Sequence, residues 1–227
     1  MKTFTPKMVL FDLDGTLIDS VPDLAFCVDE MMKALDLPVR GEAAVRNWVG
    51  NGVERLVERA LTNDLNGKPD AMLFARALPM FKALYAENTS KRSLLYPGVV
   101  EGLEIVRSRG YRMGCVTNKA EAFTLPLLRD MGVLDTFEVV ISGDTLTVKK
   151  PDPGPLFYAA GWFQCAPHEA LMVGDSISDV KAARAAGFNI ICMSYGYNHG
   201  EDIRNYNPDA VIDSMVELAE LLEPCRG

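Results

Sequence analysis

Short runs of apolar residues recur along the chain, and several of them end in polar residues. Three such runs, "MVLFD", "YRMGCVTN" and "ALMVGD", lead into Asp12, Thr117 and Asp175. Three further runs are "FEVVISGD", "NIICMS" and "AVID". Runs that are continuous rather than alternating are typical of strands buried on both faces of a parallel sheet. Patterns with helical spacing lie between them, so residues 100–225 predict alternating strands and helices, an α/β fold.

The stretch from about residue 18 to residue 92 breaks this alternation. Its apolar residues recur at helical spacing over 24–35, 53–61 and 74–85, and no strand pattern competes with them. We therefore predict an all-helical module, residues 18–92, inserted after the first strand of a Rossmann-like core made of residues 1–17 and 93–227. Two short connections on one side of such a module would let it hinge as a lid.

Composition narrows the classes of partner. The 227 residues carry 23 Lys and Arg against 31 Asp and Glu, a net charge of −8, and no basic block. This balance argues against nucleic acid or an anionic membrane surface as a partner, and an anionic substrate would need a local positive site. No apolar run reaches the ~18 residues of a membrane span or the pattern of a signal peptide. We expect a cytoplasmic protein, and the sequence leaves open whether it is a monomer or a homodimer.

The cysteines indicate a reducing environment. They are five in number, scattered, and without any CxxC spacing. An odd, scattered set does not suit a disulfide framework or a zinc site. We therefore expect free, mostly buried thiols.

Carboxylates gather at the predicted strand ends. Asp12 and Asp14 are one residue apart, and two carboxylates at 4 Å repel by ~4 kcal/mol in an effective dielectric of about 20. Asp175 and Asp179 are four residues apart at the start of a predicted helix and face the same point. A surface turn would explain Asp14 and its glycine alone. Since polar residues at neighbouring strand ends meet in an open α/β sheet, however, we expect a divalent cation with oxygen ligands, Mg²⁺, assisted by Lys150.

Four segments, taken in order, resemble the motifs of the haloacid dehalogenase superfamily of phosphotransferases. They are "DLDGT" (12–16), "VTN" (116–118), "KKPDP" (149–153) and "GDSISD" (174–179). The resemblance spans nearly the whole chain, and the helical insertion corresponds to that family's cap after the first strand. Two further segments, "WVGNGVERLVERAL" and "SYGYNHGE", resemble those of bacterial phosphoglycolate phosphatases.

The resemblance implies roles for the acidic residues and one lysine. Asp12 would be the nucleophile and form an aspartyl-phosphate. Asp14 would protonate the leaving group and then deprotonate the attacking water. Mg²⁺ would be held by Asp12, Asp175 and the carbonyl oxygen of Asp14, with Asp179 acting through a metal-bound water or through Lys150. The same lysine would neutralise the phosphoryl oxygens and orient the nucleophile.

It also implies residues that hold the phosphate. Thr117 and the backbone amide of Asn118 would bind the transferring phosphoryl oxygens. Gly15 would let the backbone turn sharply beside the phosphate. Thr16 would donate a hydrogen bond near Asp14.

The helical insertion suggests the substrate. Gly50 and Gly52 flank Asn51 just before a predicted helix, so backbone amides there could point at an anion. Arg46 and Arg55 are close enough in sequence to add charge for a carboxylate, although a plain turn with solvated arginines would also fit. The resemblance of the two segments to phosphoglycolate phosphatases implies the substrate, a small phosphomonoester, 2-phosphoglycolate, and the cap feature supports it. A sugar phosphatase, including one for muramic acid 6-phosphate, and a β-phosphoglucomutase-like phosphomutase remain open.

Overall fold

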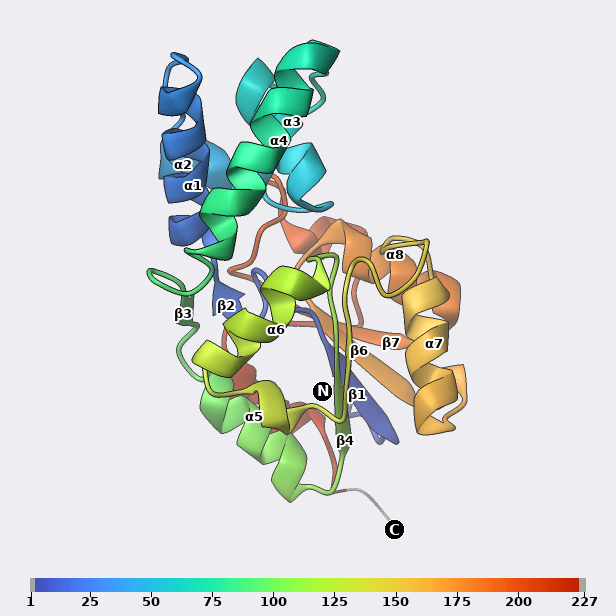
Figure 1. The fold of residues 1–227 in the computed structure, drawn as a ribbon. Helices are drawn as coiled ribbons and strands as arrows, with labels where there is room; N and C mark the ends of the chain where they lie inside the picture. Colours follow the sequence, from blue (N-terminus) through green and yellow to red (C-terminus); the bar gives the residue numbers. More distant parts are fainter. Residues whose placement is uncertain (1–2, 225–227) are drawn as a thin grey trace.

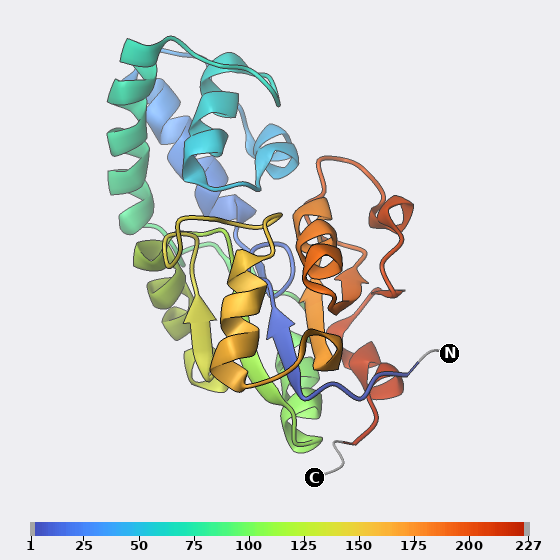
Figure 2. The ribbon, with the colours of Figure 1, turned by 90° about the vertical axis from the view of Figure 1, so that its right-hand side faces the viewer.

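A six-stranded parallel sheet forms the centre of the computed structural model, which describes residues 3–224. The spatial order of the strands is β5-β4-β1-β6-β7-β8. Their bounds are Met8–Phe11 (β1), Arg112–Val116 (β4), Val139–Ile141 (β5), Ala170–Gly174 (β6), Asn189–Met193 (β7) and Ala210–Ile212 (β8). Because β1 lies between β4 and β6 and all three run parallel, their carboxyl ends are neighbours at one edge of the sheet (Figure 2).

Helices cover both faces of this sheet, which confirms the predicted α/β fold (Figure 1). Side chains of β1 alternate between the two cores: Val9 and Phe11 pack on one side, Met8 and Leu10 on the other. The first core includes residues of α5, α6 and α9, and the second includes residues of α7 and α8. These helices span Val99–Ser108 (α5), Glu121–Asp130 (α6), Gly154–Phe163 (α7), Ile177–Ala186 (α8) and Leu218–Leu221 (α9), with short 3-10 turns at Leu134–Thr136, Pro167–Glu169, Ile203–Tyr206 and Met215–Glu217.

The helical segment stands over the carboxyl ends of the strands (Figure 2). It contains α1 (Val21–Ala34), α2 (Glu42–Trp48), α3 (Val53–Thr62) and α4 (Ala71–Ala86). Three of them follow the predicted apolar stripes, whereas α2 was not predicted because seven residues carry too little periodicity. The four helices share an apolar cluster that includes Val28, Val57 and Phe81, and Phe123 of α6 and Tyr197 also belong to it.

Two short strands join the helical segment to the sheet. β2 (Ile18–Asp19) precedes α1, and β3 (Leu94–Leu95) follows α4. They pair antiparallel, so the chain enters and leaves the segment side by side. The limits 1–17, 18–92 and 93–227 for two separate units stay a prediction. Within residues 3–224, every helix is too short or too polar to span a bilayer.

Candidate active site

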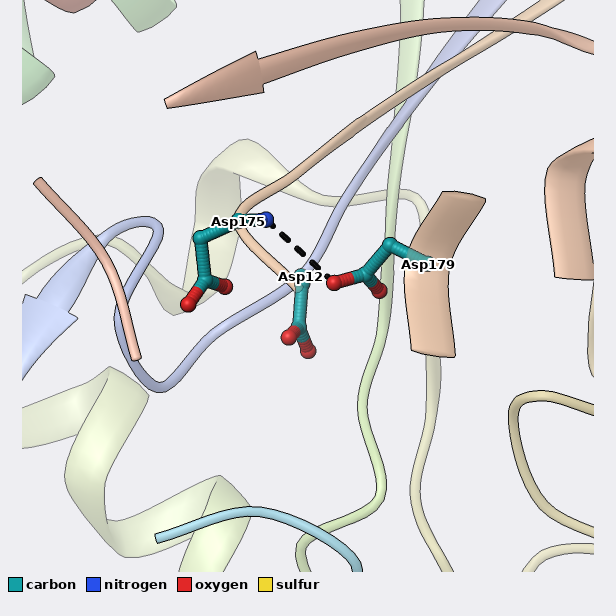
Figure 3. Close-up of side chains that lie close together, drawn as sticks. All are labelled: Asp12, Asp175 and Asp179. Atoms are coloured by element: carbon teal, nitrogen blue, oxygen red, sulfur yellow. Dashed lines mark hydrogen bonds between the residues drawn. The ribbon is translucent and has the colours of Figure 1, made fainter. Parts of the chain in front are cut away.

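Three buried carboxylates converge at the carboxyl edge of the sheet. Asp12 follows β1, Asp175 follows β6, and Asp179 lies in the first turn of α8. Each has an oxygen within 4.8 Å of an oxygen of the others. Figure 3 shows the three side chains gathered in one place. Their exposed fractions are 9%, 2% and 0%. The sequence placed these residues together correctly, because the strands that carry two of them are neighbours.

Burial of these like charges favours their neutral forms. It raises the pKa of Asp12 to about 7, against the attraction of Lys150 and with the repulsion of Asp179. The pKa of Asp175 is raised well above its ordinary value by burial and by the other two carboxylates. One lysine does not balance three buried carboxylates. Their oxygens therefore suit a hard divalent cation such as Mg²⁺, which would supply the missing positive charge.

Asp179 has both oxygens engaged. Oδ1 accepts a hydrogen bond from Lys150 Nζ at 2.7 Å. Oδ2 accepts from the backbone N–H and the hydroxyl of Ser176 at 3.1 and 2.8 Å, which caps α8. The arrangement favours the indirect role that was expected for Asp179, acting through Lys150.

Lys150 is buried and contacts several groups of the site. Its Nζ donates to the carbonyl oxygen of Val116 at 2.6 Å and lies 2.9 Å from Asp12 Oδ1, with 2% of its side chain exposed. Burial by itself would lower the pKa of Lys150, but Asp12 and Asp179 raise it above its ordinary value. The side-chain amide of Asn118 donates to the Lys150 carbonyl oxygen at 2.8 Å and so fixes the loop that carries Lys150.

Asp14 has a cationic partner that the sequence did not reveal. Lys119 Nζ lies 3.0 and 3.1 Å from the two carboxylate oxygens of Asp14, and Ser20 Oγ donates to the same carboxylate at 2.6 Å. Only 3% of the Lys119 side chain is exposed. Lys119 directly follows "VTN" (116–118), and the backbone N–H of Lys119 donates to Thr117 Oγ1 at 3.2 Å. A lysine directly after a motif at a strand end, in so acidic a site, was a signal that could have found it.

Gly15 and Thr16 support Asp175. Gly15 has φ +87°, and a Cβ there would lie 2.3 Å from Asp175 Oδ2, so the turn requires glycine. Thr16 is fully buried and donates to Asp175 Oδ1 at 2.8 Å. The expectation that Thr16 would bond near Asp14 was wrong, because its side chain points to the other strand end.

A pocket separates this edge of the sheet from the helical segment. One wall is formed by the strand ends and by Asp12, Asp14, Thr117, Asn118, Lys119, Lys150 and Asp175. The opposite wall is formed by Leu24, Val49, Gly50, Asn51, Gly52, Val53 and Leu56. We call residues 50–52 the cap loop. All three have positive φ, at +121°, +66° and +91°. Two of them are glycines, so backbone forms part of this wall.

Neither arginine expected beside the cap loop lines the pocket. Arg55 pairs with Glu58 and donates to the carbonyl oxygen of Leu65 at 3.1 Å. Arg46 donates to both carboxylate oxygens of Asp19, at 3.2 and 3.1 Å. The prediction that Arg55 contacts substrate is corrected: a carboxylate one helical turn away holds it outside the pocket.

A third arginine, which the sequence analysis did not single out, supports the cap loop. Arg59 is 5% exposed and donates to the carbonyl oxygens of Trp48 and Gly50 at 2.5 and 3.1 Å and to Asn51 Oδ1 at 3.0 Å. Burial, with Arg55 nearby, lowers the pKa of Arg59 to about 10. Partners that are backbone carbonyl groups leave no trace in a sequence, so spacing could not reveal this role.

Known proteins are similar to this chain in both sequence and fold. A family model described as "Haloacid dehalogenase-like hydrolase" matches residues 9–193. The phosphoglycolate phosphatase of Nitrosococcus oceani is 64% identical over 217 residues, 96% of each chain, and that of Nitrosospira multiformis is 47% identical over 220 residues, again 96% of each. A crystal structure described as a predicted phosphoglycolate phosphatase from Haemophilus somnus is 35% identical, with a TM-score of 0.89 over 95% of this chain and 97% of that one.

Proposed function

The chain belongs to the haloacid dehalogenase-like hydrolase family, and we propose that it is a Mg²⁺-dependent phosphomonoesterase that hydrolyses 2-phosphoglycolate to glycolate and phosphate. The observation that carries the reaction type is the buried set of Asp12, Asp175, Asp179 and Lys150. Asp12, Asp175 and Lys150 line one pocket. The substrate is supported by the curated relatives, both named phosphoglycolate phosphatase.

The metal site is part of the proposal. Asp12, Asp175 and the carbonyl oxygen of Asp14 would hold Mg²⁺, and the ion would neutralise charge on the phosphoryl group. Asp179 would keep Lys150 in place beside it.

The chain's own groups account for two successive displacements. A carboxylate oxygen of Asp12 attacks phosphorus, and the bond from phosphorus to the ester oxygen breaks as Asp14 gives its proton to that oxygen. Water then attacks the aspartyl-phosphate, Asp14 takes the proton, and Asp12 leaves as a carboxylate. Lys150 orients the nucleophile, while Thr117 and the backbone amide of Asn118 bind phosphoryl oxygens.

The test is a substrate panel with Mg²⁺ and with EDTA. We expect kcat/KM to be highest for 2-phosphoglycolate and turnover to disappear in EDTA. Equal or better turnover of glucose 6-phosphate or muramic acid 6-phosphate would favour a sugar phosphatase. Conversion of β-glucose 1-phosphate to the 6-phosphate without phosphate release would identify a phosphomutase. The cytoplasmic location and the choice between monomer and homodimer stay predictions.

A further inference from the structure

Lys119 occupies a position in the pocket that the proposed mechanism has not used. It follows Asn118 in the loop after β4, lines the pocket and contacts both oxygens of Asp14. Its Nζ also lies 4.8 Å from the centre of the Tyr85 ring, which belongs to α4. The ammonium group is therefore held between the sheet and the helical segment.

The inference rests on the proposed function, because it uses the shape of 2-phosphoglycolate. In this compound a single methylene group separates the ester oxygen from the carboxylate. Asp14 must come within hydrogen-bond distance of the ester oxygen to protonate it. Since Lys119 Nζ lies 3.0 Å from Asp14, a carboxylate one carbon away from that ester oxygen is brought to the same ammonium group.

Lys119 has donor capacity for such a contact. An ammonium group has three N–H donors, and the carboxylate of Asp14 can use two of them. The third donor faces the Tyr85 side chain, and a substrate carboxylate is a stronger acceptor for it because a charged acceptor makes the stronger hydrogen bond.

Of the other basic side chains near the pocket, Lys149 is the one without a hydrogen-bond partner among the described residues: its Nζ would lie 3.5 Å from a Cβ on Gly52, but it does not line the pocket. The remaining ones are engaged elsewhere. Lys150 is held by Asp12, Asp179 and a backbone carbonyl oxygen. Arg55 pairs with Glu58 outside the pocket. Arg59 donates hydrogen bonds to backbone carbonyl oxygens of the cap loop and of the residue Trp48 before it. Among the described residues that line the pocket, Lys119 and Lys150 carry the positive charge.

We propose that Lys119 determines specificity by binding the carboxylate of the substrate while it holds Asp14. A substrate without that carboxylate loses the contact, and a pocket with its lysine removed loses the preference. The useful quantity is therefore a ratio: kcat/KM for 2-phosphoglycolate divided by kcat/KM for ethyl phosphate, which has the same ester oxygen and no carboxylate.

The experiment measures this ratio in the wild-type enzyme and in Lys119→Met, with Mg²⁺ present. We expect Lys119→Met to lower the ratio roughly ten- to hundredfold, the range for one lost charged hydrogen bond, mainly by raising KM for 2-phosphoglycolate. Lys119→Arg, which keeps the charge, is expected to retain part of the preference. Lys82→Met is the matched control, because Lys82 pairs with Glu54 and both side chains are more than 40% exposed.

The outcomes separate this inference from the proposed function. If the wild-type enzyme does not prefer 2-phosphoglycolate, the proposed function fails. If it does, and Lys119→Met lowers kcat/KM equally for both substrates, Lys119 only supports Asp14 and the inference is overturned while the function stands.

A second measurement covers the case in which Lys119→Met does not fold, judged by its Tm and circular dichroism. A crystal structure of the wild-type enzyme with Mg²⁺, phosphate and the product glycolate would then decide. A glycolate carboxylate oxygen in hydrogen-bond contact with Lys119 Nζ supports the inference, and one beyond 4 Å overturns it.

Discussion

The two walls of the pocket differ in the kinds of groups that line them. The sheet wall presents charged side chains from three strand ends, each fixed by one or more named partners, such as Lys150 between Asp12 and Asp179. The helical wall presents apolar side chains and the backbone of the cap loop, and the nearby arginines face other groups. Bond-breaking thus depends on particular side chains at the sheet, while the shape of the opposite wall depends on backbone conformation.

This contrast predicts that substitutions in the two walls will affect different kinetic constants. Removal of a catalytic carboxylate of the sheet wall, Asp12 or Asp14, should lower kcat. A change behind the helical wall should mainly alter KM and discrimination. The four variants below test the division, from the largest expected effect to the smallest.

Asp12→Asn should remove activity. An amide is a poor nucleophile, so kcat should fall by at least ~10³-fold on 2-phosphoglycolate and on p-nitrophenyl phosphate alike. Steady-state kinetics with Mg²⁺ would measure this loss. Activity within tenfold of the wild-type value would contradict the nucleophile assignment.

The same variant makes a prediction about stability. In the metal-free protein, burial raises the pKa of Asp12 from 3.8 to about 7, so the wild-type protein loses stability as the pH rises from about 4 to about 7. Asp12→Asn lacks this contribution, and its Tm in EDTA should fall less between pH 5 and pH 8. An equal fall of Tm in both proteins would show that the pKa of Asp12 is not raised in the folded protein.

Asp14→Asn should keep the nucleophile and lose the proton transfers. We expect kcat on alkyl phosphates to fall by ~10²-fold or more. The loss should be smaller on p-nitrophenyl phosphate, whose leaving group needs little protonation. A comparison of the two substrates measures the difference, and a normal rate on 2-phosphoglycolate would rule out the acid–base role.

Arg59→Met should loosen the helical wall. It leaves the carbonyl oxygens of Trp48 and Gly50 without their donors, at a cost of about 1–3 kcal/mol in the free energy of unfolding. We expect KM for 2-phosphoglycolate to rise several-fold while kcat stays closer to the wild-type value. Urea unfolding and steady-state kinetics would check both, and an unchanged KM would mean that the cap loop holds its shape without Arg59.

Arg55→Ala should have the smallest effect. Its side chain contacts Glu58 and the carbonyl oxygen of Leu65 rather than the pocket. We expect kcat/KM for 2-phosphoglycolate to change by less than about threefold, in line with a partly exposed ion pair. A tenfold loss confined to 2-phosphoglycolate would instead restore Arg55 as a carboxylate ligand and weaken the contrast between the walls.

The sequence predicted the sheet wall well because its parts depend on local pattern. Continuous apolar runs mark buried parallel strands, and polar residues directly after them mark the reactive edge. Asp12, Thr117 and Asp175 are each such residues, and the structure places them around one pocket. The α/β fold followed from the same runs.

The helical wall was predicted less well because its contacts join residues through the backbone. Arg59 binds carbonyl oxygens, which every residue has, so nothing in the sequence distinguishes it from Arg55. The pairing of Lys119 with Asp14 spans 105 positions and depends on β4 lying beside β1. Three-dimensional packing determines which of several basic residues contacts a given group, and the sequence alone does not show it.

The β2–β3 pair has a consequence for how this enzyme could be rebuilt. The polypeptide leaves the sheet at Ile18 and returns at Leu95, and these two residues face each other across one rung of an antiparallel ribbon. A segment inserted at this position needs its two ends to be as close together as two neighbouring strands. Grafting a relative's helices between residues 19 and 94 would therefore replace the opposite wall and keep Asp12, Asp175 and Lys150, and the graft would have to retain Ser20 and Tyr85, which contact Asp14 and Lys119.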